Sequence, residues 1–415
     1  MRRGSGIIRI KTPLGPLEQT GDSKPCSSAD EAPPLRGFFL LALSGISFYR
    51  WAMSVYIQSL TLSHFRSHRR TQIAFDGRPV ALSGPNGAGK TNVLEAVSLL
   101  SPGRGLRRAA SDDLSRKPEL LGWKIIAELS TPNGARNIQT WAESGQSRQV
   151  RIDDKAAPQV ALAALLGMVW LTPAMDRLWL EGAEGRRRFL DRMVLSFRPE
   201  HAAQVLTYEK SMRERNKLLR DGVGDGAWYS ALEAQMAQAG AQISANRRAV
   251  IANLATHADH DSPFPVADLM LDCSAPQDEG ELARALADGR RQDMAAGRSL
   301  TGPHRADLRA IWAAKGMEAA QCSTGEQKAM LISLILSNAR ALASTGTVPL
   351  LLLDEVAAHL DADRRAALYD AICSLHVQAF MTGTGRELFS DLGARAQHFS
   401  VTDADGRSHL VESTS

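Results

Sequence analysis

The sequence predicts an α/β fold with a P-loop, a mixed sheet core and an inserted helical arm. Three observations support this. A short apolar strand, a glycine-rich loop and a helix follow one another over residues 79–100. A uniformly apolar run at 349–353 is typical of a parallel strand covered on both faces. Between them lies a long stretch, 174–257, rich in helix-forming residues.

Residues 1–52 are expected to be an extension outside the fold, either disordered or the product of an upstream start codon assigned in error. Its apolar run, 38–48, is too short to span a bilayer and is interrupted by serine and glycine. The stretch before that run makes a poor signal peptide. We therefore expect no membrane partner.

The composition is that of an ordinary soluble globular protein, with 415 residues, 44% hydrophobic and 23% charged. This length predicts two domains, or one domain with a large insertion. The net charge of +4 is only a mild indication of an anionic partner, so evidence for nucleic acid must come from local clusters. Four scattered cysteines indicate neither a zinc site nor a disulfide framework and suit the cytoplasm.

Taken in order, the elements predict an ATPase lobe interrupted by an arm. The first part of the lobe is 53–170, with strands at 55–62, 79–83, 123–129, 137–142 and 150–153. The helical arm or lid, 171–298, is broken at 221–226 as in a helical hairpin and continues with a strand at 266–272 and a helix at 278–294. The second part of the lobe, 299–415, alternates strands and helices: 307–312, 325–341, 349–353, 361–375, 377–381 and 397–401.

The segment from Gly84 to Thr91 has the spacing with which a backbone surrounds a polyphosphate. Its glycines turn N–H groups inward, Lys90 reaches the β- and γ-phosphates, and the Thr91 hydroxyl is placed for Mg²⁺. The alternative is a glycine-rich turn with a solvated lysine. The predicted ATP-binding residues are Gly84, Pro85, Asn86, Gly87, Ala88, Gly89, Lys90, Thr91 and Asn92.

Two acids, Asp354 and Glu355, directly follow the apolar strand. We expect Asp354 to lie beside the phosphate loop and to hold Mg²⁺, directly or through water. Glu355 is then placed to polarise a water against the γ-phosphate, which makes Glu355 and Lys90 the candidate catalytic residues. The alternative is a strand that simply exits into solvent.

A further anion site is predicted at Ser323-Thr-Gly-Glu-Gln327, where a hydroxyl residue and a glycine precede a long apolar helix. The same letters also describe a plain capping box, in which Ser323 and Glu326 only satisfy the helix start. Both interpretations remain open at this point.

The order of these motifs resembles that of ATP-binding cassette (ABC) heads, with Asp361 following the acidic pair. This resemblance implies an ABC-type ATPase head in which Ser323, Gly325, Gln327 and Asp361 of one copy serve the ATP of a second copy. It therefore implies an ATP-dependent homodimer. Three departures are visible: Glu326 replaces a glycine of the transporter signature, no glutamine lies near Pro173, and Thr382-Gly-Thr replaces the usual switch histidine.

Three segments resemble the RecF family within this class. They are Ser59-Leu-Thr-Leu-Ser-His-Phe-Arg66, Arg186-Arg-Arg-Phe-Leu-Asp191 and Thr301-Gly-Pro-His-Arg-Ala-Asp307. The resemblance implies a weak DNA-dependent ATPase that acts as a switch at gapped or single-stranded DNA. It also implies work with RecR and RecO in recombinational repair, supporting RecA loading, replication restart and SOS induction.

Local arginine clusters are candidates for DNA contact. The alternative is a solvated surface. No aromatic residues are interleaved with them, so we expect sequence-independent backbone binding. In Arg186–Arg188, one arginine either clamps a phosphate or pairs with an acid of the arm. His304 and Arg305 either face the nucleotide or the lobe interface, or belong to a purely structural turn. The candidate DNA-binding residues are Arg66, Arg69, Arg70, Arg104, Arg107 and Arg108.

Three other functions compete with this interpretation. A cassette transporter subunit is disfavoured because more than 200 residues separate the phosphate loop from the signature. Another SMC-like DNA tethering or processing head stays open, although long heptad stretches are absent. A small-molecule P-loop kinase is disfavoured by the acidic pair and by the signature.

Overall fold

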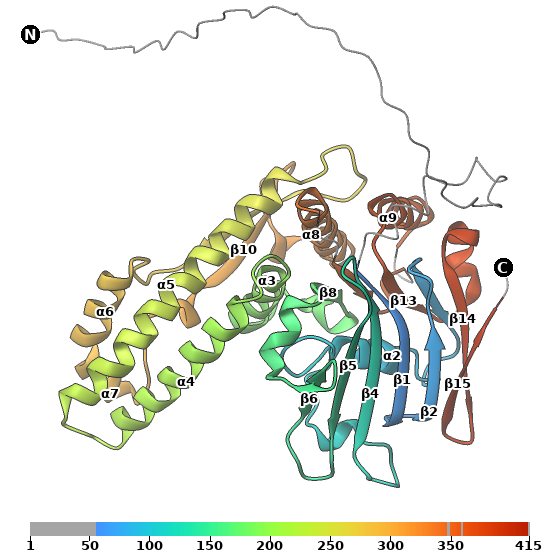
Figure 1. The fold of residues 1–415 in the computed structure, drawn as a ribbon. Helices are drawn as coiled ribbons and strands as arrows, with labels where there is room; N and C mark the ends of the chain where they lie inside the picture. The colour runs from blue at the N-terminus through green and yellow to red at the C-terminus, as the bar shows by residue number, and fades with distance from the viewer. Residues whose placement is uncertain (1–54, 347–348, 358–359, 414–415) are drawn as a thin grey trace, which may run out of the picture. The chain divides into compact units, whose positions relative to one another are not determined.

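The computed structural model describes residues 55–346, 349–357 and 360–413. The predicted extension, 1–52, lies outside the described residues. The described chain contains two six-stranded sheets and one three-stranded sheet (Figure 1). Among the described residues, no helix has both the length and the apolar character that crossing a bilayer requires.

The first sheet is antiparallel throughout, in the order β2-β1-β4-β5-β6-β7. Burial alternates along β4, as expected for strands that cover a core with one face only. The strands are β1 (Tyr56–Phe65), β2 (His68–Ala74), β4 (Trp123–Ser130), β5 (Arg136–Ala142), β6 (Gln149–Ile152) and β7 (Lys155–Ala156).

The second sheet is mixed, in the order β15-β14-β3-β13-β12-β8, and only the β14–β15 pair is antiparallel. Its β12 is buried at every residue between two parallel neighbours, which confirms the prediction from its four leucines. The strands are β3 (Val80–Ser83), β8 (Met168–Leu171), β12 (Leu350–Leu353), β13 (Ala379–Gly383), β14 (Gln397–Ala404) and β15 (Arg407–Glu412).

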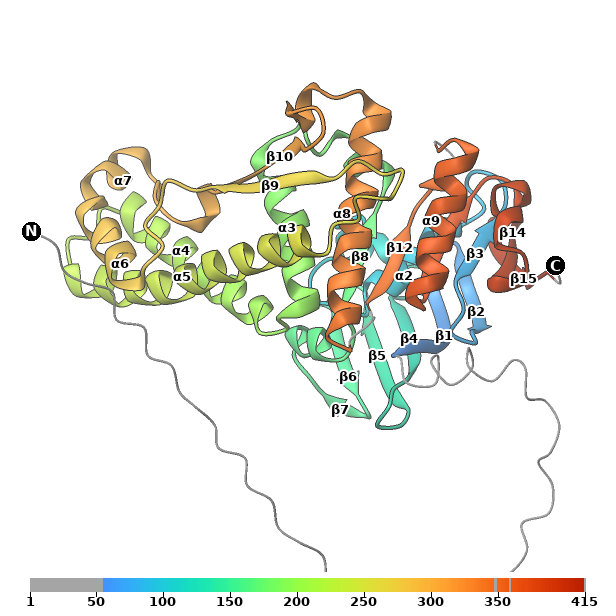
Figure 2. The ribbon, with the colours of Figure 1, turned by 90° about the horizontal axis from the view of Figure 1, so that it is seen from above.

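Helix α2 (Lys90–Ser98) packs between these sheets, since one apolar cluster contains Leu60 of β1, Leu82 of β3 and Leu94 of α2. A second apolar cluster joins the other face of the mixed sheet to the helices that cover it, α8 (Thr324–Ser344) and α9 (Ala362–Leu375) (Figure 2). The nucleotide loop therefore lies at the junction of two well-packed layers.

The arm is built on α4 (His201–Arg220) and α5 (Gly226–Thr256), which run side by side in both views (Figures 1 and 2). The chain reverses between them at the predicted glycine-rich break. The predicted helix 278–294 is in fact two helices, because the chain bends at Gly289. The remaining arm elements are α3 (Ala183–Phe197), α6 (Glu279–Asp288), α7 (Arg290–Ala296) and β9 (Ala267–Asp272). The strands β10 (Asp307–Trp312) and β11 (Met317–Glu318), whose residues we expected in the second part of the lobe, form one sheet with β9.

Short 3-10 turns complete the described chain: η1 (Asp112–Leu114), η2 (Gln159–Ala164), η3 (Pro173–Arg177), η4 (Pro303–Arg305), η5 (Ala319–Gln321) and η7 (Arg386–Arg395). Three substantial strands were not predicted from sequence, namely β2, β8 and β15. Of these, β8 matters most for function, because it is the outer neighbour of β12 and leads into η3.

Candidate ATP site

Two glycines shape the phosphate loop between β3 and α2. Gly84 has φ of +155°, and a Cβ there would lie 2.0 Å from the carbonyl oxygen of Val401. Gly89 has φ of +101°, and a Cβ there would lie 2.1 Å from Ser408 Oγ. Both positions therefore require glycine. Gly87, at the exposed turn of the loop, has open space around it.

Lys90 is buried, and its ammonium folds back over its own loop. Its Nζ donates to the carbonyl oxygens of Gly84 at 2.7 Å and Pro85 at 3.0 Å. Burial lowers the pKa of Lys90, while Glu355 and Asp354 act in the opposite direction. A desolvated ammonium that is held only by carbonyl oxygens would gain from an anion, and no side chain caps the adjacent start of α2.

The two halves of the predicted site meet although they are far apart in sequence. Thr91 Oγ1 donates to Asp354 Oδ1 at 2.8 Å. A hydroxyl and a carboxylate side by side are ligands that Mg²⁺ accepts together with phosphate oxygens. The described residues contain no cluster of three or more His, Cys, Asp or Glu that could bind a metal by themselves. A Mg²⁺ site completed by phosphate oxygens does not need one.

Thr382 orients the acidic pair from β13. Its Oγ1 donates to Asp354 Oδ1 at 2.8 Å and accepts the backbone N–H of Glu355 at 2.8 Å. Glu355 has φ of +52°, a left-handed conformation that is uncommon for a non-glycine residue. The threonine at the switch position thus contacts both acids, a role that its place in the sequence did not reveal.

A polar cavity of about 470 Å³ adjoins the start of α2. It is lined by Arg66, Ser67, Asn92, Arg107 and Arg116 among others. Asn92 Nδ2 donates to Ser67 Oγ at 2.7 Å, which joins the first helical turn to the β1–β2 turn. The volume lies in the range of small-ligand sites, so this cavity has room for the nucleoside part of ATP.

The signature segment forms the capping box and leaves its outer end exposed. Ser323 Oγ accepts the N–H of Glu326 at 3.4 Å, and the Glu326 carboxylate accepts the N–H of Ser323 at 2.8 Å. Ser323 and Gly325 are exposed, as a contact to a second molecule requires. Gln327 is buried and donates to the carbonyl of Cys322 at 2.8 Å, so in this conformation it does not share the outward face predicted for it.

Asp361 is exposed and caps α9, accepting the N–H of Arg364 at 2.8 Å. Two of the residues between it and the acidic pair, 358–359, lie outside the described residues. Asp361 therefore has a local structural role as a helix cap.

The candidate DNA-binding arginines divide into two groups. Arg66 is held by Glu95 through two hydrogen bonds, at 2.9 and 2.8 Å, and Glu95 is almost fully buried. This pairing gives Arg66 an internal partner. Arg107 also approaches that carboxylate, at 3.5 Å, but its side chain is exposed. The exposed members are Arg69 and Arg70 on β2, and Arg104, Arg107 and Arg108 after α2.

Two of the segments that resemble the RecF family, 186–191 and 301–307, pack against each other. Arg186 pairs with Asp307 at 2.7 Å, and Arg187 donates to the carbonyl of Ala306 at 2.7 Å. His304 Nδ1 accepts the Tyr208 hydroxyl at 2.7 Å. The structure thus favours pairing with a carboxylate for Arg186, although Asp307 lies beyond the predicted end of the arm, and it favours a structural turn for His304.

Two residues near the site, Lys328 and Trp170, were not predicted from the sequence. Lys328 is buried on α8, with Nζ 3.5 Å from Asp176 Oδ2 on η3. Burial lowers the pKa of Lys328, opposed by Asp176 and by the acidic pair. Trp170 on β8 lies under Arg192 of α3, with the guanidinium carbon 3.9 Å from the ring centre. The uniformly apolar sequence of β8 could have predicted that strand. No local pattern indicated that Trp170 packs against Arg192 or that Lys328 lies near Asp176.

Comparison with known proteins agrees with this geometry. Residues 56–407 match the family model described as RecF/RecN/SMC N terminal domain. The chain is 47% identical over 365 residues to "DNA replication and repair protein RecF" of Rhizobium etli (strain CIAT 652), covering 84% of this chain and 98% of the relative. It is 47% identical over 363 residues to the protein of the same name from Mesorhizobium japonicum, covering 83% of this chain and 96% of the relative.

Solved structures show the same fold. A structure described as "the recombination mediator protein RecF-ATPrS in RecFOR pathway" matches with a TM-score of 0.72 and 21% identity, covering 86% of this chain and 99% of that one. An Smc head domain from Pyrococcus furiosus matches with a TM-score of 0.51 and 18% identity, covering 87% of this chain and 96% of that one. The fold is therefore that of an ABC-type ATPase head, and the chain belongs to the RecF family.

Proposed function

We propose that this protein is an ATP-dependent DNA-binding protein of recombinational repair that closes into a dimer around ATP. The observation that supports the proposal is the contact between Thr91 and Asp354, which brings the two predicted halves of the Mg-ATP site together within one chain. Ser323 and Gly325 are exposed, as a contact with a second copy would require. The curated relatives are named DNA replication and repair proteins, and one solved relative is described as RecF-ATP.

Each site residue has a separate task in this scheme. Lys90 leaves its loop carbonyls and pairs with the β- and γ-phosphates. Thr91 and Asp354 hold Mg²⁺, which neutralises phosphate charge. Glu355 accepts a proton from the attacking water, while Thr382 keeps both acids in position. Hydrolysis is slow and serves as a timer.

Dimerisation follows from the incomplete second half of the site. Ser323, Gly325 and Asp361 of one copy close over the triphosphate of the other. A ligand that contacts both copies favours the closed dimer by its differential affinity, and loss of the γ-phosphate removes that preference. ATP hydrolysis therefore releases the clamp.

The exposed arginines are the proposed DNA-backbone contacts: Arg69, Arg70, Arg104, Arg107 and Arg108. We do not include Arg66 among these contacts, because its guanidinium is paired with Glu95. By family likeness we place the protein in the cytoplasm, at gapped DNA, with RecR and RecO as partners. Its proposed outcome is RecA loading, replication restart and SOS induction.

The test is the mass of the full chain in solution, with and without Mg-ATP and gapped DNA. Wild type should change from one to two copies with ATP, and Glu355→Gln should remain dimeric because hydrolysis is blocked. Lys90→Met should stay monomeric and lose ATP binding, whereas the exposed control Lys210→Met should behave as wild type.

Two results would count against the scheme. Unchanged ATP hydrolysis in Glu355→Gln would remove Glu355 as the base. A lone protomer at saturating non-cleavable ATP analogue and DNA would refute the shared site. Co-purification with a membrane permease, a nuclease or a phosphorylated small molecule would favour the transporter, processing-head or kinase alternatives respectively.

A further inference from the structure

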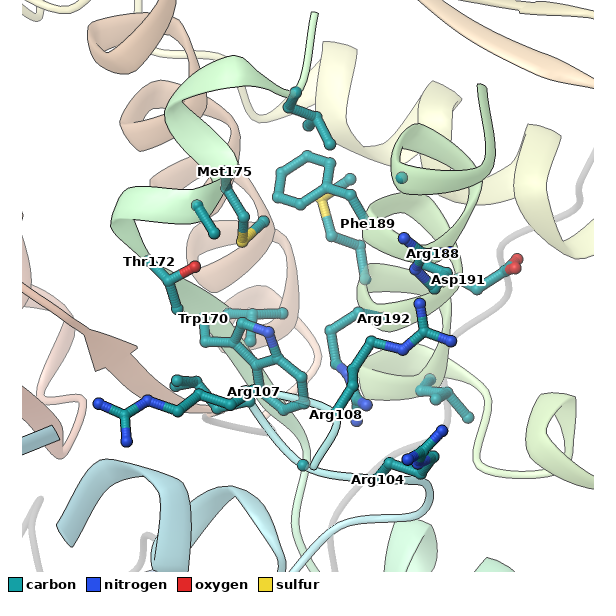
Figure 3. A pocket seen from close by; sticks show the side chains of 18 of the residues that line it. Arg104, Arg107, Arg108, Trp170, Thr172, Met175, Arg188, Phe189, Asp191 and Arg192 are labelled. Atoms are coloured by element: carbon teal, nitrogen blue, oxygen red, sulfur yellow. The ribbon is translucent and has the colours of Figure 1, made fainter. Parts of the chain in front are cut away.

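A second cavity, of about 690 Å³, lies beside the ATP site and is not explained by it. It is enclosed by the loop after α2, the end of β8, η3 and α3 (Figure 3). Figure 3 shows Trp170 on the same cavity as the arginines of the loop and of α3. Five arginines line the cavity: Arg104, Arg107, Arg108, Arg188 and Arg192.

Four carboxylates also line this cavity, those of Glu181, Asp191, Glu209 and Asp354, and Arg107 lies 3.5 Å from Glu95, so the free positive charge is concentrated at particular arginines. Arg104 is exposed and has no hydrogen-bond or ion-pair partner among the described residues. Arg108 is 3.7 Å from Glu184, which Arg188 also contacts, so one carboxylate serves two guanidiniums. Asp191 borders the cavity, but its carboxylate is held by Arg247 at 2.7 and 2.8 Å. An anion entering here would find free guanidinium donors.

Arg192 adds a cation that no carboxylate pairs with. It lies over Trp170 and donates to Ser101 Oγ at 3.1 Å and to the carbonyl of Pro102 at 3.4 Å. Burial lowers the pKa of Arg192 to about 10, so the guanidinium still carries its charge at neutral pH. The indole is thus oriented by a cation on one face, while Trp170 remains only half-buried and contributes to the cavity wall.

The rest of the wall is mainly apolar, although the carboxylates of Glu181, Glu209 and Asp354 also border it. Met175 and Leu178 of η3 and Phe189 of α3 line it together with Trp170. An inorganic anion would not use this surface. A ligand that fits both walls carries a phosphate and a flat apolar ring, which is the chemistry of a nucleotide.

We propose that this cavity takes one unpaired nucleotide of a DNA strand, with its base against Trp170 and its phosphates on Arg104 and Arg108. The proposal rests on the DNA-binding function above and deepens it, because a paired base in a duplex cannot enter a cavity without leaving its stack. The protein would then distinguish gapped DNA from duplex DNA. Under this proposal a base contact is added to the backbone binding expected from the sequence, because the fold brings an aromatic ring to arginines that lack one nearby in sequence.

The position of the cavity links this recognition to ATP. Asp354 borders the same cavity, and Arg107 at its edge donates to Asn92 Oδ1 at 3.0 Å, at the start of α2. A nucleotide bound on Arg108 therefore lies next to the Mg²⁺ side of the ATP site.

The test compares three labelled duplexes in the presence of Mg²⁺ and a non-cleavable ATP analogue. One is fully paired, one has a single unpaired thymidine, and one has an abasic sugar at that position. Wild type should bind the unpaired thymidine about tenfold more tightly than the other two. Trp170→Leu should remove that preference, and Arg104→Ala should weaken binding to the unpaired thymidine about threefold. Trp228→Leu and Arg284→Ala, exposed residues of the arm, are the matched controls.

A second readout uses 2-aminopurine at the unpaired position, whose fluorescence should be quenched in wild type and restored in Trp170→Leu. Equal binding of all three duplexes by wild type would overturn the cavity assignment and leave the backbone function intact. Displacement of the unpaired thymidine by free thymidine monophosphate or by ATP at matched concentration would assign the cavity to free nucleotides instead. Failure of wild type to bind any of the three would refute the DNA-binding function itself.

Discussion

Two clusters of buried charge, one in the arm and one at the ATP site, differ in how completely the protein satisfies them. In the arm, the fully buried Arg215 donates to Glu233 at 3.0 Å, Asp293 at 2.6 Å and Ser299 at 2.8 Å. At the ATP site, Lys90 contacts only the carbonyls of its own loop, and Asp354 accepts from two hydroxyls. In the arm cluster Arg215 is paired with two carboxylates. At the ATP site, Lys90 and Asp354 hydrogen-bond only to uncharged groups of the described chain.

This difference separates structural charge from functional charge. A buried ion pair that is fully hydrogen-bonded holds the surrounding helices in one arrangement, and removing one partner leaves an uncompensated charge. A buried charge with incomplete partners costs stability until a ligand arrives. Substitutions in the arm should therefore change folding, and substitutions at the ATP site should change binding.

The largest effect on stability is expected for Arg215→Met. The change leaves Asp293 buried without its cation, so the free energy of unfolding should fall by about 3–5 kcal/mol. Urea denaturation of the full chain measures it. Arg213→Met is the matched control, since Arg213 is exposed and 3.7 Å from Glu209, and it should change stability by less than about 0.5 kcal/mol. A loss below about 1 kcal/mol for Arg215→Met would break the comparison.

A smaller effect is expected at Asp191, where arm helices α3 and α5 meet. Burial acts to raise the pKa of Asp191, but Arg247 and His201 together lower it to about 2. Because the folded pKa is below the unfolded one, the stabilisation is present above about pH 4 and is lost as pH falls toward 2. It amounts to about 2 kcal/mol. Denaturation at stepped pH should show a shallower acid dependence for Asp191→Asn, and an unchanged profile would contradict this.

A mixed effect is expected for Thr382→Val, which removes the hydroxyl between Asp354 and Glu355. Stability should fall by about 1 kcal/mol, the usual value for one buried hydrogen bond. Mg²⁺-dependent ATP affinity should fall about tenfold, as for other groups that orient a metal ligand. Titration with a fluorescent ATP analogue, with and without Mg²⁺, separates the two. Thr382→Ser retains the hydroxyl and should restore affinity.

The smallest effect on stability is expected for Lys90→Met. Burial disfavours the charged ammonium, so its removal should change the free energy of unfolding by less than about 1 kcal/mol while ATP binding is lost. Thermal unfolding with and without ATP measures both, because wild type alone should be stabilised by the ligand. A large loss of stability without ATP would show that Lys90 is structural after all.

Much of the ATP site could be predicted because its two halves are continuous in sequence. The loop from Gly84 to Thr91 and the pair Asp354 and Glu355 are each contiguous, and their backbone requirements restrict the residue types. The cap formed by Ser323 and Glu326 was equally local, although the letters alone did not decide between a cap and an anion site. The inward face of Gln327 and the Glu95 partner of Arg66 depend on packing and were not predictable.

By itself, the sequence determined the nucleotide chemistry, the strand and helix order, and the family. These properties depend on residues close together along the chain, where spacing limits geometry. Only the tertiary structure decided which arginines are already paired, that Thr382 orients the acids, and that Trp170 meets Arg192. Those contacts join distant segments, and their partners are selected by sheet register and helix packing, which no local pattern encodes.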